Sequence, residues 1–534
     1  MPVNAANPNI KHVFVLMLEN RSFDHMLGFL NNDISKYTNN YLDVNYKAEK
    51  PALDVMPYDP GHEFNDVYQQ LTGLDPATNP YNGGQYPKID NSGFVTNYAT
   101  TKSKGEGGAT SNFGEIMKCY DTAKQLPIMT ALIKNFTLCD NWYASLPGPT
   151  WPNRFFVHAA SSGGLDDSPT TEDLILWESI YGFRFPNGSI YDLLKKHKKK
   201  YRLYRGVSHP ISGCIPGVAA LHNIEFWDTH NYDRFESDLH KKYNYDYTFI
   251  EPNYGDIVNN SYSGGQSQHP MDDVRGGEAL IKSTYEALRN SPIWEQSMLI
   301  ITYDEHGGFY DHVAPPPAIA PGDNPGPKYS KHTFNFQQYG VRVPAIVVSA
   351  YTPQGIDHTL YDHSSVPATL ETMFGMPPLT NRDGNANNVT SLVALPKSRT
   401  NTPTQLPEIA PLTVEAALIM RAARPLVNEY LETVDSGNLP FFLNIVHKAE
   451  LERAKRKNPA LEFAARSAPH TIRTKAQARE YLNNILPGLL AEQAEEKSPA
   501  KPKAKKSPVK KVVAKKASAK KSVSKKTAKK KNKK

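Results

Sequence analysis

Short apolar runs recur along the chain, and two of them end abruptly in polar residues. Residues 12–18 form one run and lead directly into Glu19 and Asn20, while residues 299–303 form another and lead into a charged segment at 304–308. Runs of this length are typical of strands that are buried on both faces of a parallel sheet. The two glycines of the second segment allow a sharp turn and a close approach to a ligand. The pattern therefore predicts two interior strands that deliver polar side chains to their carboxyl ends.

Other segments alternate between strand and helix patterns. Strands are predicted at residues 135–140, 201–204 and 343–349, and helices at residues 112–125, 129–134, 189–200, 274–290 and 365–374. Such alternation is typical of an α/β fold, in which helices cover both faces of a mainly parallel central sheet. Residues 31–111, and the polar stretch from 205 to 270, show neither pattern, so we expect long loops there.

The net charge of the 534-residue chain conceals two parts of opposite sign. The formal charge is +7, but residues 501–534 hold 17 lysines and no acidic residue, and the remainder carries 44 basic against 54 acidic side chains. From residue 497 onward the composition is dominated by Lys, Ala, Ser and Pro, which bury too little apolar surface to fold. We expect a disordered basic tail at 497–534, a helical extension at 436–496 and a main domain at 1–435.

The tail has three interpretations. Its lysines suit salt-dependent binding of nucleic acid or of an anionic membrane surface, and a solubilising extension is the third.

The three cysteines show no CxxC spacing, so neither a disulfide framework nor a zinc ribbon is predicted. We find no signal peptide and no apolar run long enough to span a membrane. The expected location is cytoplasmic or peripheral to a membrane.

Carboxylates gather at the predicted strand ends. In open α/β sheets, ligands bind beyond the carboxyl ends of the strands, where Glu19 and Asn20 would meet Asp304 and Glu305 if the two strands share one sheet. Neighbouring carboxylates repel one another unless a cation lies between them. Their oxygens suit Mg²⁺, Ca²⁺ or Mn²⁺. A divalent metal ion is therefore predicted, with helix capping by Glu19 and Asn20 as the alternative.

Thr150 offers a hydroxyl between Pro149 and Trp151. A metal-bound hydroxyl has a lowered pKa and becomes a nucleophile near neutral pH, and histidines can hold phosphoryl oxygens and protonate a leaving group. The alternative for Thr150 is a simple turn residue. Arg154 either braces a strand-end carboxylate or binds substrate.

Four motifs together resemble a known family. They lie at residues 19–25, 148–154, 269–270 and 303–312, and they are similar to the motifs of the phosphoesterase family of bacterial phospholipases C and acid phosphatases, which also includes plant non-specific phospholipases C. The resemblance runs from about residue 11 to about residue 385. Trp151 and Gln268 depart from the family pattern, and both departures concern contacts with substrate.

The resemblance implies a fold and a set of roles. The fold would be an alkaline-phosphatase-like α/β sandwich, with the catalytic domain in residues 1–435. One metal ion would be bound by Glu19, Asn20, Asp304, Glu305 and Thr150. Thr150 would also be the nucleophile and form a phospho-enzyme intermediate. The phosphate would be contacted by His62, His209, His269 and His306, and of these His62, His269 and His306 would be catalytic. Asn153 and Arg154 are further expected substrate contacts.

The sequence therefore predicts a metal-dependent hydrolase of phosphate esters. Phospholipase C-type cleavage of phospholipids is the preferred reaction, and an acid phosphatase acting on phosphomonoesters would use the same centre. From a different class, the third hypothesis is a catalytically inert protein that binds anionic polymers through its tail.

Overall fold

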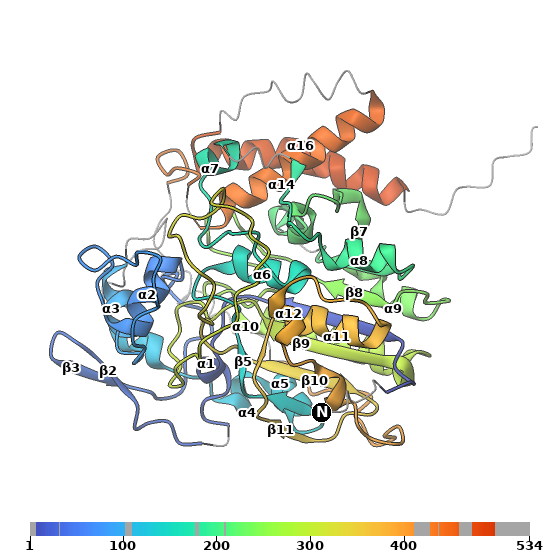
Figure 1. Ribbon diagram of the computed structural model, residues 1–534, viewed down its shortest axis with the longest axis horizontal. Coiled ribbons are helices and arrows are strands. Elements are labelled where there is room, and N and C mark those ends of the chain that lie inside the picture. Colours follow the sequence, from blue (N-terminus) through green and yellow to red (C-terminus); the bar gives the residue numbers. More distant parts are fainter. Residues whose placement is uncertain are drawn as a thin grey trace, which may run out of the picture.

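The computed structural model describes residues 7–496, apart from residues 31, 102–108, 110, 177–180, 208–209, 411–427, 436 and 459–471. Its centre is an eight-stranded sheet (Figure 1). From edge to edge the strands are β11 (Gly355–Asp357), β4 (Thr137–Cys139), β10 (Ala345–Ser349), β9 (Ser297–Tyr303), β1 (His12–Leu18), β8 (Tyr247–Ile250), β6 (Tyr201–Arg205) and β7 (Thr229–Asn231). β10 runs antiparallel to both of its neighbours, and the other pairs in this sheet are parallel.

The two predicted interior strands, β1 and β9, are neighbours in the middle of the sheet. Leu18 at the end of β1 lies opposite Tyr303 at the end of β9. All of β9 is buried, and so is all of β1 after His12. Their unbroken apolar pattern reflects the helices on both faces. The parallel register carries the polar residues that follow both strands to the same edge of the sheet.

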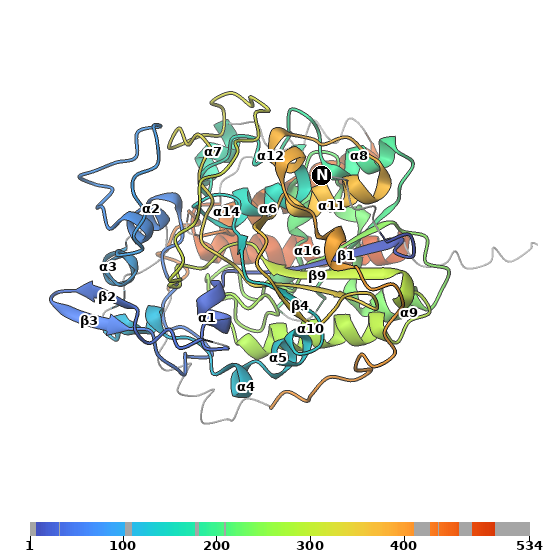
Figure 2. The ribbon, with the colours of Figure 1, turned by 60° about the horizontal axis from the view of Figure 1, so that its bottom comes forward.

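Helices cover both faces of the sheet. One face carries α5 (Pro127–Ile133), α9 (Phe235–Leu239) and α10 (Val274–Arg289), and the other carries α6 (Thr150–Ala159), α8 (Ile190–Lys196) and α11 (Ser365–Phe374) (Figure 2). Glu278 on α10 accepts hydrogen bonds from the backbone N–H groups of Ile128 (2.7 Å) and Met129 (3.2 Å), which ties the first turn of α5 to α10. The predicted α/β class, with a mainly parallel sheet between helices, is confirmed.

Three predictions about individual segments were wrong. Residues 31–111 are not loop throughout, because they contain the hairpin of β2 (Thr38–Tyr41) and β3 (Val44–Lys47) and the helices α2 (Phe64–Thr72) and α3 (Phe94–Thr100). β8 lies within a stretch that was expected to be loop. The helix expected at residues 112–125 is divided into the 3₁₀ helix η1 (Phe113–Met117) and α4 (Thr122–Gln125).

The division between η1 and α4 has a clear cause in hydrogen bonding. The backbone N–H of Cys119 donates to the carbonyl oxygen of Glu49, and that of Tyr120 donates to the carbonyl oxygen of His25, each at 2.8 Å. These bonds to distant segments replace the bonds that a continuous helix would make.

Two C-terminal helices, α14 (Leu439–Lys457) and α16 (Lys475–Glu496), pack against the main body (Figure 1). Phe441 and Phe442 of α14 belong to the same hydrophobic core as the central sheet. The division into domains at residues 435 and 496 stays a prediction, and the tail at 497–534 lies outside the described residues. Among the helices described, none combines the length and the apolar character needed to cross a membrane.

Candidate active site

The ends of β1 and β9 meet in two interlocking turns. The backbone N–H of Asn20 donates to Asp304 Oδ1 (2.9 Å), and the N–H of Arg21 donates to the carbonyl oxygen of Glu305 (2.9 Å). Asn20 adopts a left-handed conformation with φ of 59°, which asparagine tolerates better than most residues. The structure thus brings Glu19, Asn20, Asp304 and Glu305 to one edge of the sheet.

Gly307 and Gly308 make the second turn compact. Both have left-handed φ angles, 63° and 74°. A Cβ on Gly307 would lie 2.2 Å from the carbonyl oxygen of Asn20, and one on Gly308 would lie 2.6 Å from the carbonyl oxygen of Gly61. Only glycine allows both approaches. These contacts bring the Asn20 turn and the loop that carries His62 against the residues that follow β9.

A buried arginine from α6 holds the strand-end carboxylates. Arg154 Nε donates to Asp304 Oδ2 (2.8 Å), and the guanidinium lies 3.7 Å from Glu19 Oε1 and 3.9 Å from Glu251 Oε1. Its other N–H groups donate to the hydroxyl of Tyr254 (3.0 Å) and to a carbonyl oxygen of β1 (3.2 Å). Arg154 therefore braces carboxylates, and its contact with substrate stays a prediction.

Negative charge at this edge is only partly compensated. Burial raises the pKa of Glu19 to about 8 and that of Asp304 to about 6, although the neighbouring Arg154 cation acts in the opposite direction. Both carboxylate oxygens of Glu19, and Oε1 of Glu305, are buried without a hydrogen-bond partner among the described residues. Carboxylate oxygens left without a proton donor suit a hard divalent cation. The donor set therefore fits the predicted metal ion.

Thr150 is the first residue of α6, and its side chain faces the strand ends. Thr150 is buried, with 1% of its surface exposed, and its hydroxyl donates to Asn20 Oδ1 (3.4 Å). Asn153 fixes the turn that precedes the helix, because its side chain bonds the backbone of residues 146–149 at 2.8 to 3.3 Å. Amide groups in the first turn of a helix stabilise negative charge. Asn153 thus positions Thr150, and its contact with substrate stays a prediction.

Two histidines lie on the other side of Asn20. His62 Nδ1 donates to the carbonyl oxygen of Pro60 (2.8 Å), so its Nε2 accepts from Asn20 Nδ2 at 3.5 Å. The His269 ring lies 6.2 Å from that of His62 and stacks on Tyr262 with 3.4 Å between centroids. Burial lowers the pKa of His269 well below its ordinary value. Asn20 therefore joins the hydroxyl of Thr150 to the histidine side of the site.

Asp59 completes this group of residues. Its Oδ2 lies 3.6 Å from His269 Nε2. Burial raises the pKa of Asp59 to about 7, while His62 acts in the opposite direction and Glu305 in the same direction. Asp59 precedes His62 by three residues, but the sequence predicts no role for it, because nothing in the local pattern shows that it meets His269.

In the described part of the chain, two groups of three side chains place one possible metal-ligand atom each within 4.8 Å of one another. One group is Asp59, His62 and His269, and the other is Asp24, Asp311 and His312. Neither contains the predicted ligands. Arg342 occupies the second cluster, where it donates to Asp24 Oδ1 (3.1 Å) and Asp311 Oδ1 (2.9 Å), and His312 Nδ1 pairs with Asp24 Oδ2 (2.6 Å). We interpret the second cluster as a structural ion-pair network.

His306 holds its neighbours in place. Its Nε2 lies 2.7 Å from Gln70 Oε1, and its Nδ1 lies 3.2 Å from Glu305 Oε2. Both ring nitrogens are thus engaged by protein groups, and contact of His306 with phosphate stays a prediction. His209, the fourth predicted phosphate contact, lies outside the described residues.

Two further buried residues, Arg21 and His363, support the site. Arg21 is fully buried, and it donates to the carbonyl oxygens of Gln268 (2.6 Å) and His269 (3.2 Å). His363 Nε2 donates to the carbonyl oxygen of Asp304 (2.5 Å). The position of Arg21 within the motif at residues 19–25 was the sequence signal that could have indicated its role. The bond from His363 is visible only in the tertiary structure.

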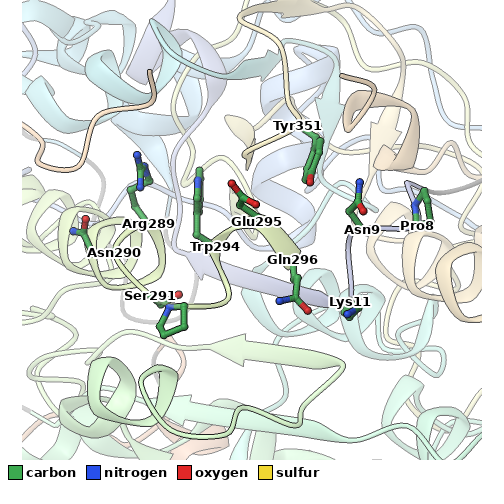
Figure 3. Close-up of a pocket in the computed structure, with 11 residues that line it drawn as sticks. Pro8, Asn9, Lys11, Arg289, Asn290, Ser291, Trp294, Glu295, Gln296 and Tyr351 are labelled. Carbon is green, nitrogen blue, oxygen red and sulfur yellow. The ribbon is translucent and has the colours of Figure 1, made fainter. Parts of the chain in front are cut away.

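A surface cavity of about 620 Å³ lies away from these residues (Figure 3). Its lining includes Lys11, Arg289, Trp294 and Glu295. Lys11 directly precedes β1, Trp294 and Glu295 lie just before β9, and Arg289 ends α10, whereas the candidate site follows both strands. The cavity therefore lies at the opposite end of the sheet from the strand-end carboxylates and is not part of the candidate site.

Comparisons with known proteins agree with the motifs. The sequence model described as the Phosphoesterase family matches residues 10–377. The chain is 33% identical to non-specific phospholipase C6 of Arabidopsis thaliana over 429 residues, which span 76% of each protein. It is 27% identical to phospholipase C A of Mycobacterium tuberculosis (strain ATCC 25618 / H37Rv) over 412 residues, which span 69% of this chain and 74% of that protein.

Similarity to solved structures is weaker. A protein in the alkaline phosphatase superfamily from Vibrio parahaemolyticus aligns over 56% of this chain and 79% of its own, with 13% identity and a TM-score of 0.31. A TM-score this low supports no inference about the site.

Proposed function

This chain belongs to the Phosphoesterase family, and from that premise we propose that it is a metal-dependent hydrolase that cleaves phospholipids by a phospholipase C-type reaction. Family membership makes it a phosphoric ester hydrolase. Its plant and mycobacterial relatives are named phospholipases C, which supports a phospholipid as the substrate.

The observation that carries this proposal is the position of Asn20. Its side chain bonds the hydroxyl of Thr150 on one side and the imidazole of His62 on the other, and its backbone bonds Asp304. A nucleophile, an acid–base group and a set of hard oxygen ligands therefore adjoin one residue. These three components suit metal-assisted phosphoryl transfer.

The proposed metal ligands are Glu19, Asn20, Asp304 and Glu305, with Thr150 as the fifth. A divalent cation there would lower the pKa of the threonine hydroxyl and neutralise charge on the phosphate. Arg154 braces Asp304 from the α6 side. The N-terminus of α6 adds favourable electrostatics for an anionic phosphate.

In the proposed reaction, Thr150 Oγ attacks phosphorus, and the bond from phosphorus to the glycerol oxygen breaks. Diacylglycerol leaves with a proton, and the head-group phosphate stays esterified to Thr150. Water then attacks phosphorus, breaks the bond to Thr150 Oγ and releases the phosphorylated head group. His62 and His269 are the proposed carriers of the protons taken from threonine and water and given to the leaving oxygens.

A test of the nucleophile compares the parent protein with Thr150→Ala and Thr150→Ser. We expect the alanine variant to lose hydrolysis while keeping its melting temperature, and the serine variant to retain turnover because it keeps a hydroxyl. Metal analysis of the purified parent should find a divalent ion, and Glu305→Gln should bind less of it. Turnover by Thr150→Ala near the parental rate would exclude this residue as the nucleophile.

A side-by-side assay decides between phospholipid phosphodiesters and phosphomonoesters as the substrate class. Phosphatidylcholine vesicles and a simple aryl phosphomonoester are supplied side by side at matched phosphate concentration. Faster release of phosphocholine supports the phospholipase C reaction. Faster release of inorganic phosphate from the monoester would instead favour the phosphatase alternative, which uses the same residues.

A further inference from the structure

The first turn of α14 reaches the candidate site although it lies outside residues 10–377, which the family model matches. We refer to residues 438–442 as the 438–442 segment. Asn438, Phe441 and Phe442 are each at most 3% exposed. In Figure 1, α14 lies beyond α6 as seen from the sheet, and aromatic contacts join the two helices.

The first contact leads to His269. Asn438 Nδ2 donates to the hydroxyl of Tyr262 (3.1 Å), and the Tyr262 ring stacks on the His269 ring with 14° between their planes. A ring held flat against a neighbour can rotate only if that neighbour moves. The hydrogen bond from Asn438 therefore fixes the plane in which the His269 imidazole lies.

The second contact leads to Thr150. The Phe441 ring stacks on Trp151 with 3.9 Å between centroids and 14° between planes, and the Phe442 ring meets the same indole edge-on at 5.2 Å. Trp151 directly follows Thr150 in the first turn of α6. The two phenylalanines thus set the position of the turn that carries the hydroxyl.

The third contact leads to the carboxylates. Phe442 packs on Tyr254 with 5.2 Å between centroids. The Tyr254 hydroxyl accepts from Arg154 (3.0 Å) and donates to Glu251 (2.9 Å), and Arg154 in turn bonds Asp304. A shift of Phe442 would therefore displace the guanidinium that braces the strand ends.

We propose that the 438–442 segment is a positioning element of the catalytic centre. Through Tyr262, Trp151 and Tyr254 it holds three parts of the site in register: the histidine side, the nucleophile and the carboxylates. This inference rests on the proposed function, because it concerns the same site. Since a displacement of about 1 Å at reacting groups costs about 100-fold in rate, loss of the segment's contacts should lower kcat more than it raises KM.

The test compares full-length variants in the segment with a matched control on the same helix. Phe441→Leu and Phe442→Leu keep most of the volume but remove the ring contacts, and Asn438→Ala removes only the bond to Tyr262. Leu451→Ala is the control, because Leu451 is buried and lies ten residues, or about 15 Å, farther along α14 than Phe441. It should lower stability without moving the site.

We expect Phe441→Leu and Phe442→Leu to lower kcat about tenfold or more, with KM within about twofold of the parent. Asn438→Ala should also lower kcat, but by a smaller factor than the phenylalanine variants. Leu451→Ala should retain the parental kcat despite a lower melting temperature, and Phe441→Tyr, which keeps the ring, should restore turnover. If a phenylalanine variant does not fold, Asn438→Ala decides the question.

The parent and Thr150→Ala, assayed on the same phosphoesters, separate the two proposals. A parent without hydrolytic activity refutes the proposed function and with it the role of the segment. A parent that is active while Thr150→Ala is inert supports the proposed function. In that case, segment variants that turn over as fast as Leu451→Ala would overturn the positioning role alone.

Discussion

Gly307 shows how little space separates the two turns of the site. A Cβ there would lie 2.2 Å from the carbonyl oxygen of Asn20. Gly375 has nearly the same φ, 64° against 63°, but no atom within 4 Å of its Cβ position. An alanine at either residue meets the same backbone penalty of about 1 kcal/mol, whereas only Gly307→Ala adds a clash with backbone. Gly375 is therefore a matched control.

We expect Gly307→Ala to displace Asn20 or Glu305 and to lower kcat about 100-fold. Gly375→Ala should lose a little stability and keep its turnover. Steady-state kinetics and thermal melting of both variants provide the measurement. Equal kcat values for the two would mean that the close approach of Gly307 to Asn20 does not matter for catalysis.

A substitution of Arg154 can distinguish whether this residue braces carboxylates or binds the substrate. Its planar guanidinium donates to Asp304, Tyr254 and a β1 carbonyl oxygen at once. Lysine in its place would keep the charge but could not reproduce this geometry. We expect Arg154→Lys to lower kcat about 100-fold by misplacing the carboxylates, with little change in KM. A raised KM at parental kcat would instead indicate direct contact with the phosphate.

At the scale of elements, the sequence predicted the features that local patterns determine. β1 and β9 have unbroken apolar runs, so both the strands and the convergence of the carboxylates at their ends could be anticipated. α2 was missed because its polar residues dominate its composition, although Phe64, Val67 and Leu71 bury one helical face. The α2 case shows that periodicity carries more information than composition.

The histidine side of the site could be predicted only in part. His62 follows a recognisable loop motif, but its link to Asn20 and the proximity of Asp59 to His269 depend on long-range packing. The same holds for Tyr262, which stacks on His269 and is held from α14. Contacts between segments so far apart in the chain leave no trace in local spacing.

The pair of helices α11 and α12 (Asn381–Asn385) contains a buried acid away from the site, Glu371. Burial, with the neighbouring Asp383 carboxylate, raises the pKa of Glu371 to about 10. Between the ordinary glutamate pKa and this value, the folded state retains a proton that the unfolded state releases. Stability should therefore fall as pH rises through this range, by up to about 1.4 kcal/mol per pH unit for one proton.

We predict that Glu371→Gln removes this slope, because glutamine does not ionise and keeps a donor toward Asp383. Free energies of unfolding from denaturant titrations at pH 6 to 9 should diverge, with the parent losing more stability than the variant toward pH 9. Glu236→Gln, at an exposed position on α9, is the control and should follow the parent. Parallel curves for the parent and Glu371→Gln would contradict the prediction.

At the scale of the whole molecule, charge is strongly segregated. The body is acidic, with a charge of about −10 outside residues 501–534, and those residues carry 17 lysines. The acidic body is repelled by an anionic lipid surface, whereas each lysine near such a surface contributes about 1 kcal/mol of attraction. An enzyme of the proposed phospholipase C type would meet its substrate at that surface, so the tail offers a means of attachment.

We predict that deletion of residues 497–534 leaves turnover of a soluble phosphoester unchanged and lowers activity on vesicles rich in anionic lipid. On neutral phosphatidylcholine vesicles the two proteins should behave alike. At about 1 M salt, where the screening length is about 3 Å, the difference on anionic vesicles should disappear. If the truncated protein were as active as the parent on anionic vesicles as well as on neutral ones, the tail would have no role in membrane attachment. If the truncated protein lost turnover of the soluble phosphoester, the body would depend on the tail.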